Sequence, residues 1–195
     1  MELMNLKSLL GENPLFIFAL EDEAADRFDD YSPLFIGVGK VGAAYRLTKR
    51  LSVERPSIIV NLGSAGSAIF PRGEVVCCTK FVQRDMDASL IGCKKYETPF
   101  SAEGAVLSYG LAVEGLTQGT CGTGDNFETN HTSTLYNLVD MEAYALAYVA
   151  KMEQIPFLSM KYISDGADHS AAEDWTTTVR KSADALRLEI DRLLM

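Results

Sequence analysis

The sequence has few histidines and no cysteine pair of the CxxC type, and both shortages limit its chemistry. Only two histidines occur in 195 residues, His131 and His169, and they are far apart. Metal sites need several ligands at set spacings, so we expect no metal site. Two of the four cysteines, Cys77 and Cys78, are adjacent on a predicted strand, where their side chains would point to opposite faces. We therefore expect reduced thiols, which is the usual state in the cytoplasm.

The sequence also lacks an excess of positive charge and any long apolar run. The net charge is -9 and the isoelectric point is about 4.7. A surface of this sign repels nucleic-acid phosphates and anionic membranes, so we expect neither as a partner. No run approaches the roughly 20 apolar residues of a membrane helix. The N-terminal stretch carries Glu2 and the polar break GENP, unlike a secretory signal. The cytoplasm is the expected location.

The sequence is rich in short apolar runs, and 47% of its residues are hydrophobic. This content suits one domain that spans residues 1–195. Runs typical of buried strands are PLFIFAL, PLFIGVG, SIIVNLG, EVVCCTKFV and PFLSMKYIS. Helical patterns lie between them. This alternation predicts an α/β fold with a mostly parallel sheet and helices on both faces. Residues 87–119 are broken by Gly, Pro and Lys, and predict a loop or an antiparallel hairpin.

Two of the predicted helices show apolar stripes. On the helix after GVG, one face is expected to pack inward, and it contains Val41, Ala44, Tyr45, Thr48 and Leu51. The last helix is predicted to begin with a capping box of Ser170 and Glu173. Its stripe contains Trp175, Val179, Leu186, Ile190 and Leu193.

Acidic residues follow three of the predicted strands. PLFIFAL leads to Glu23, NLVDM leads to Glu142, and PFLSMKYIS leads to Asp165. Each acid alone could stabilise a helix start or close a turn. In α/β sheets, however, ligands bind at the carboxyl ends of strands. Three acids on one edge therefore indicate a functional site.

Glycine-rich turns supply the other candidate motifs. GVGKVG, from Gly37 to Gly42, matches GxGxxG, but a dinucleotide site needs an acid at the end of the next strand. That strand ends in Asn61, so a tight turn that requires glycine is favoured. NLGSAGS predicts a loop whose N–H groups could hold an anion or hydroxyl, or one that merely allows close packing. CGTGDNF predicts a turn, after which Phe127 could be core or could stack on a flat ligand.

Seven motifs occur in a fixed order along the chain: FALEDEA, GVGKVGAA, NLGSAGS, RDMDAS, GTGDNF, DMEAYALA and KYISDGAD. Together they resemble the purine nucleoside phosphorylase and nucleosidase superfamily, in particular its 5′-methylthioadenosine/S-adenosylhomocysteine nucleosidases. The resemblance implies a three-layer α/β/α fold with a central mixed sheet, a homodimer and no cofactor. It also implies hydrolysis of the N-glycosidic bond of a purine nucleoside, a 5′-thio-substituted adenosine, with release of the free base.

The resemblance further implies a role for each motif. Glu23 would activate the attacking water, and Asp165 would protonate or hydrogen-bond N7 of the leaving base. This division suits a transition state that resembles an oxocarbenium ion, because one group must guide water while another neutralises the departing base. The substrate-binding residues would be Ser64, Gly66, Phe127, Glu128, Met141, Glu142 and Lys161. Among them, Glu142 would bind the ribose hydroxyls and Phe127 would stack on the purine.

Two residues depart from the family pattern. Lys161 stands where arginine is frequent, and lysine lacks the bidentate fork of a guanidinium. Glu128 follows Phe127 where an apolar residue is commoner, and it could move selectivity away from adenine. The segment 87–119 is also short for the family, which leaves the 5′ substituent open.

Two alternative functions stay open. A purine nucleoside phosphorylase would need cations to hold phosphate. The family's phosphorylases place arginines near the first strand and before the small-residue loop, where this chain has none. A non-catalytic nucleoside-binding protein would not need both Glu23 and Asp165. Hydrolysis is therefore the favoured activity.

Overall fold

The computed structural model describes residues 6–168 and 171–195, without the side chains of residues 171–174, 176, 177 and 179. The strands are β1 Pro14–Phe18, β2 Leu34–Phe35, β3 Ile58–Gly66, β4 Val75–Gln83, β5 Leu107–Ser108, β6 Thr117–Thr123, β7 Leu138–Asp140 and β8 Phe157–Asp165. The α-helices are α1 Leu6–Glu12, α2 Glu21–Ala24, α3 Lys40–Leu51, α4 Ala143–Met152 and α5 Ala171–Leu194. None of the helices within these described residues is long and apolar enough to cross a membrane.

The strands form one mixed sheet, as the family resemblance implied. Its order is β2-β1-β3-β7-β6-β4-β5, and β8 pairs with both β3 and β4. The pairs β1–β2, β1–β3, β3–β8, β4–β6 and β6–β7 are parallel, whereas β3–β7, β4–β5 and β4–β8 are antiparallel. Strands β3, β8, β4, β6 and β7 therefore close into a ring. The carboxyl end of β3 meets β7 where Gly66 pairs with Val139.

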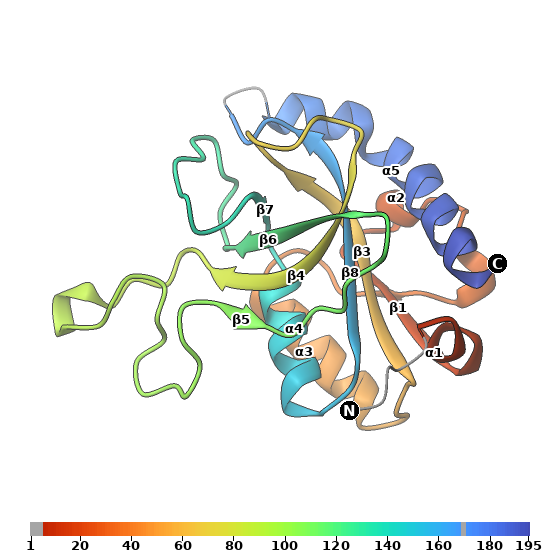
Figure 1. Cartoon of the computed structure of the whole chain (residues 1–195), viewed down its shortest axis with the longest axis horizontal. Helices are drawn as coiled ribbons and strands as arrows, with labels where there is room; N and C mark the ends of the chain where they lie inside the picture. The colour runs from red at the N-terminus through yellow and green to blue at the C-terminus, as the bar shows by residue number, and fades with distance from the viewer. Residues whose placement is uncertain (1–5, 169–170) are drawn as a thin grey trace.

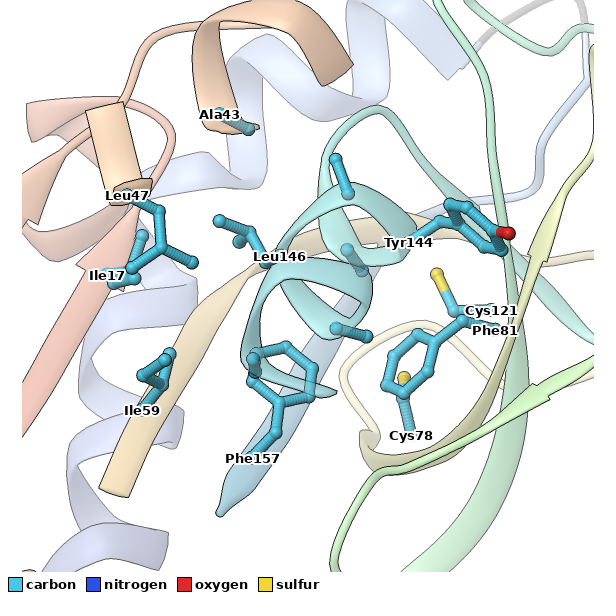
Figure 2. Close-up of a cluster of buried hydrophobic side chains, with 14 of the residues drawn as sticks. Ile17, Ala43, Leu47, Ile59, Cys78, Phe81, Cys121, Tyr144, Leu146 and Phe157 are labelled. Carbon is cyan, nitrogen blue, oxygen red and sulfur yellow. The ribbon is translucent and has the colours of Figure 1, made fainter. Parts of the chain in front are cut away.

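Helices cover both faces of the sheet because its strands alternate apolar side chains between two cores. On β1, Leu15 and Ile17 belong to one core, and Phe16 and Phe18 belong to the other. The first core packs α3 and α4 on the sheet, and it contains Leu47 of α3, Leu146 of α4 and Phe157 of β8 (Figure 2). The second core packs α1 and α5. Figure 1 shows α5 along one side of β3 and β8, and α3 and α4 on the other. The predicted three layers are confirmed.

The adjacent cysteines test the alternation directly. Cys78 belongs to the core under α4 (Figure 2), whereas Cys77 belongs to the core under α5. Both are buried free thiols. The prediction that their side chains point to opposite faces is confirmed.

The predicted inward face of α3 was right only in part: Ala44 and Leu51 pack against the core, but the other apolar residues of this face do not. The helix is buried through Ala43 and Leu47, while Val41 is 80% exposed and Tyr45 is 65% exposed. The predicted stripe lies next to the stripe of Ala43 and Leu47 that is buried, and Ala44, which is partly buried, lies on the border between them. The spacing of apolar residues therefore could not show which of the two stripes packs against α4.

Two motifs predicted as loops belong to strands. NLGSAG forms most of β3, which continues to Gly66, and the first residues of CGTGDNF end β6. Strand β6 lacks an apolar run, because its glycines make room for neighbours: a Cβ on Gly122 would come within 2.6 Å of the Tyr136 ring. Residues 87–119 form mainly a loop, and the part of it before β5 projects from the body in Figure 1. Only the short β5 pairs back antiparallel to β4.

The last helix follows its predicted stripe in part. Leu186 and Ile190 are buried in the core under α5, and Leu193 packs against it. Trp175 instead turns toward the pocket described below. The expected capping box falls on Ser170 and Glu173, which lie outside the described residues and side chains.

Candidate active site

A pocket of about 270 Å³ lies where β1, β3, β7 and β8 end. All of the predicted site residues except Lys161 line it: Glu23, Ser64, Gly66, Phe127, Glu128, Met141, Glu142 and Asp165. The strand ends converge here because the ring closes at the Gly66–Val139 pair. The edge predicted from three strand-end acids is therefore a real cavity in the fold.

Glu23 lies in the first turn of α2 and is buried. Its Oε1 accepts hydrogen bonds from the Ser64 backbone N (2.9 Å) and from Ser64 Oγ (2.7 Å). Its Oε2 accepts a longer bond, 3.3 Å, from the backbone N of Leu20. Only this last contact belongs to helix capping. The two shorter bonds join the carboxylate to β3, and so Glu23 is held at the pocket wall.

Trp175 extends this arrangement from α5. Its indole Nε1 donates to Ser64 Oγ over 2.8 Å, and its side chain lines the pocket. From the sequence, Trp175 was predicted to belong to the apolar stripe of the last helix. Its position in the pocket wall was not predicted. The spacing of the stripe held no signal for it, because the partner lies 111 residues away in the chain.

Asp165 ends β8 and is buried. Its Oδ1 accepts from the backbone N of Ala167 (2.9 Å), and its Oδ2 accepts from Ser164 Oγ (2.8 Å). The sheet register shifts beside Gly66, opposite Asp165. A Cβ on Gly66 would collide with Asp165 Oδ1, so glycine at this position leaves room for the carboxyl group.

Glu142 is the residue that precedes α4, but its side chain makes no capping bond to that helix. Its Oε1 instead accepts from the backbone N of Gly39 (2.8 Å), at the start of α3. The glycine-rich turn thus presents an N–H group to a carboxylate. Burial, together with the nearby charge of Asp140, raises the pKa of Glu142 to about 8. The alternative in which this acid caps a helix start through its side chain is therefore wrong for Glu142.

Asp140 performs the capping. Its Oδ2 accepts from the backbone N of Ala143 (2.8 Å), and its Oδ1 accepts from Thr123 Oγ1 (2.6 Å). Lys161, which we expected among the substrate-binding residues, lies behind the pocket, with its Nζ 2.9 Å from Asp140 Oδ2. Burial opposes the charge on Asp140, but the Lys161 ammonium outweighs it and holds the pKa of that carboxyl below its usual value.

The remaining wall comes from the loop after β6. Phe127 on this loop is 46% exposed beside the pocket, and Glu128 lies next to it. The buried Arg84 holds the loop in place. Its Nη1 donates to Asn126 Oδ1 (2.9 Å) and lies 3.4 Å from Glu128 Oε2, and its Nη2 donates to Gly124 O. RDMDAS, which begins at Arg84, is one of the seven ordered motifs, but Arg84 was not among the predicted site residues.

The geometry brings an acceptor carboxylate, a second carboxyl group and an aromatic ring into one cavity. Glu23, Asp165 and Phe127 come from different elements of the fold. Such a set can activate water, serve a leaving group and bind a flat ring. Among the residues that the structure describes, no cluster of His, Cys, Asp and Glu could hold a metal ion.

Comparisons with known proteins agree with this fold and identify the family. A model of the phosphorylase superfamily matches residues 34–194. The 5′-methylthioadenosine/S-adenosylhomocysteine nucleosidase of Haemophilus influenzae (strain PittEE) is 30% identical over 181 residues, which cover 80% of this chain and 79% of the relative. Among solved structures, the corresponding nucleosidase of Helicobacter pylori superposes with a TM-score of 0.82 at 18% identity, over 94% of this chain and 98% of that one. A futalosine hydrolase mutant of Helicobacter pylori gives 0.81 at 17% identity, over 93% and 97%. The chain belongs to the phosphorylase superfamily, as its ordered motifs predicted.

Proposed function

We propose that the chain hydrolyses the N-glycosidic bond of a purine nucleoside and releases the free base. The substrate class that fits best is a 5′-thio-substituted adenosine, such as methylthioadenosine or S-adenosylhomocysteine. The observation that carries the proposal is that Glu23 and Asp165 face one cavity from separate elements, the first turn of α2 and the end of β8. The Haemophilus influenzae relative is a nucleosidase by name, which supports the same reaction.

Each pocket residue has a role in this proposal. Glu23 accepts a proton from the attacking water as positive charge develops on the sugar. Asp165 donates a proton or a hydrogen bond to the leaving base. Glu142, with Met141 beside it, accepts hydrogen bonds from the ribose hydroxyls, and Phe127 stacks on the purine.

The proposal gives Glu128 and Lys161 separate tasks. Glu128 lies in the wall beside Phe127, where it would contact the edge of the base. Lys161 would act indirectly, because its ammonium fixes Asp140 at the start of α4 and so sets the position of Glu142. Ser64 and Gly66 would shape the wall between Glu23 and Asp165.

A phosphorylase is the second candidate, and one observation weighs against it. Arg84 is the cation in the described pocket wall, but its guanidinium donates to Gly124 O and to Asn126. A phosphate ion would have to compete with these bonds, and Glu23 would repel it. Water is therefore the better nucleophile for this pocket.

A product analysis tests the proposal. The protein is incubated with methylthioadenosine, S-adenosylhomocysteine, adenosine and inosine, with and without phosphate, and the products are identified by mass spectrometry. Free sugar and free base, at rates independent of phosphate, are expected. Glu23→Gln and Asp165→Asn should each lower kcat by about 100-fold or more, the usual worth of a general acid or base. Ribose-1-phosphate as the main product would establish the phosphorylase, and no cleavage would favour a binding protein.

We further propose that the chain acts as a homodimer in the cytoplasm. The exposed apolar stripe on α3 supports the dimer, because Val41 and Tyr45 leave a hydrophobic surface open. Val38, which precedes this helix, is also exposed and lines the pocket. The unpaired thiols of Cys77, Cys78 and Cys121 suit a reducing compartment.

A further inference from the structure

A chain of hydrogen bonds leads from Trp175 to the carboxylate of Glu23. The indole Nε1 of Trp175 lies 2.8 Å from Ser64 Oγ, which lies 2.7 Å from Glu23 Oε1. All three side chains line the same pocket. They come from α5, β3 and α2, and these elements are brought together only by the tertiary fold.

The chemistry of the donors fixes the direction of this chain. An indole N–H can only donate a hydrogen bond, whereas a hydroxyl both donates and accepts. Ser64 Oγ therefore accepts from Trp175, and its own proton is directed to Glu23 Oε1. Donors in such a series strengthen one another in a buried setting. The two hydrogen bonds together hold the Ser64 hydroxyl and Glu23 Oε1 in one orientation.

The two carboxylate oxygens of Glu23 accept different numbers of hydrogen bonds. Oε1 receives two short bonds, from the Ser64 backbone N (2.9 Å) and from Ser64 Oγ. Oε2 receives only the 3.3 Å bond from the backbone N of Leu20. A carboxylate oxygen can accept more than one hydrogen bond. Oε2 is therefore the oxygen with capacity left to accept a proton from water.

We propose that Trp175 is a positioning residue for the general base and acts on Glu23 through Ser64. Its N–H group orients the Ser64 hydroxyl, which holds Glu23 Oε1 in place and leaves Oε2 for the water. The proposal rests on the hydrolytic function proposed above. A purely structural Trp175 would contribute its ring alone, so the N–H group distinguishes the two roles.

The substitution Trp175→Phe keeps an aromatic ring and removes the N–H group. We expect kcat to fall about tenfold, which is the size of effect expected from one hydrogen bond in a charged network, while KM stays within about twofold. The acid limb of the kcat/KM profile should move to higher pH, because a carboxylate that loses hydrogen-bond support is protonated more easily. An unchanged kcat and pH profile would overturn the proposal.

A double-mutant cycle shows whether the effect passes through Ser64. In a Ser64→Ala background, Trp175→Phe should have little further effect on kcat, because the link is already broken. A full tenfold loss in that background would assign Trp175 a role independent of Ser64. Thr178→Val is the matched control. Thr178 lies one turn further along α5 and its Oγ1 donates to Ser164 O (3.3 Å), so this variant should leave the acid limb in place.

Fluorescence tests the link without any substrate. Trp175 is the only tryptophan in the chain, so all tryptophan emission reports on this position. Titration with acid should produce a step in the emission of the wild type, and the step should vanish in Glu23→Gln and weaken in Ser64→Ala. A wild type that cleaves nucleosides but shows no such step would contradict the link. A step in a protein that cleaves no nucleoside would leave the link standing and refute the proposed function.

Discussion

Glu142 carries a buried carboxyl group whose ionisation has a cost for the fold. Its pKa is raised from the ordinary 4.5 to about 8, first by burial and then by the charge of Asp140. The folded state therefore binds a proton that the unfolded state releases between these two values. The resulting stability is fully present below pH 4.5, decreases as the pH rises, and is lost above pH 8.

Glu142→Gln should remove this pH dependence, because the amide keeps an acceptor for the Gly39 N–H group but does not ionise. Thermal unfolding at pH 5, 7 and 9 measures the effect. The wild type should lose stability relative to the variant, by an amount on the order of a few kcal/mol, as the pH increases across this range. If the stabilities of the two proteins changed with pH in parallel, Glu142 would not titrate with a raised pKa in the folded protein.

At the scale of single residues, the sequence revealed groups whose chemistry is visible in local context. Glu23, Glu142 and Asp165 stood out because an acid after an apolar run is unusual, and the structure places all three in one pocket. Trp175 and Arg84 did not stand out. An aromatic residue in an apolar stripe normally packs in a core, and an arginine after a strand is normally solvated. Their partners, Ser64 and the loop after β6, are fixed only by tertiary structure.

The buried Lys161–Asp140 pair joins β8 to the start of α4. Asp140 also accepts from Thr123 on β6 and from the backbone N of Ala143. Lys161→Met would leave the Asp140 carboxylate buried without its countercharge. Breaking a buried ion pair from one side costs roughly 3–5 kcal/mol, so urea unfolding should show a loss of this size, and Lys161→Met with Asp140→Asn should recover part of it.

An exposed pair on the same protein provides the control for that prediction. Arg180 Nη2 lies 3.1 Å from Asp22 Oδ1, and both side chains are largely exposed. Arg180→Met should cost less than about 1 kcal/mol, as is usual for surface pairs. If the free energies of unfolding of Lys161→Met and Arg180→Met fell equally, the buried pair would have no special part in joining these elements.

At the scale of elements, the apolar runs predicted β1, β3, β4 and β8, because buried strands need continuous hydrophobic residues. Strand β6 was not predicted, because close neighbours such as Tyr136 leave room only for glycine in it, and glycines interrupt an apolar run. Helix α3 was predicted, but its buried face was predicted only in part, since its two apolar stripes are adjacent. Which stripe is buried depends on where α4 packs, and α4 is about 100 residues away in the chain.

At the scale of the whole molecule, the sequence predicted the edge that carries the site but not the ring that closes it. Strand-end acids indicate a common edge only when the strands are parallel. Here β7 is antiparallel to β3, and the two strands pair at a single position, Gly66 at the carboxyl end of β3 with Val139 in β7. Local patterns do not encode such a closure. The motif resemblance supplied the mixed sheet that the apolar runs alone did not predict.

The exposed stripe of α3 gives the last prediction, which concerns assembly. Val41 and Tyr45 lie on an open face of the helix, and a second copy of the chain would remove them from water. Val41→Glu would place a charge without a partner in that interface, which is strongly unfavourable. Light scattering should give twice the 21.4 kDa chain mass for the wild type and the single mass for Val41→Glu. Leu188→Glu is the matched control, because Leu188 is 66% exposed on α5, and it should stay dimeric. A dimer that persists in Val41→Glu would mean that another surface forms the interface, and a monomeric wild type would refute the dimer itself.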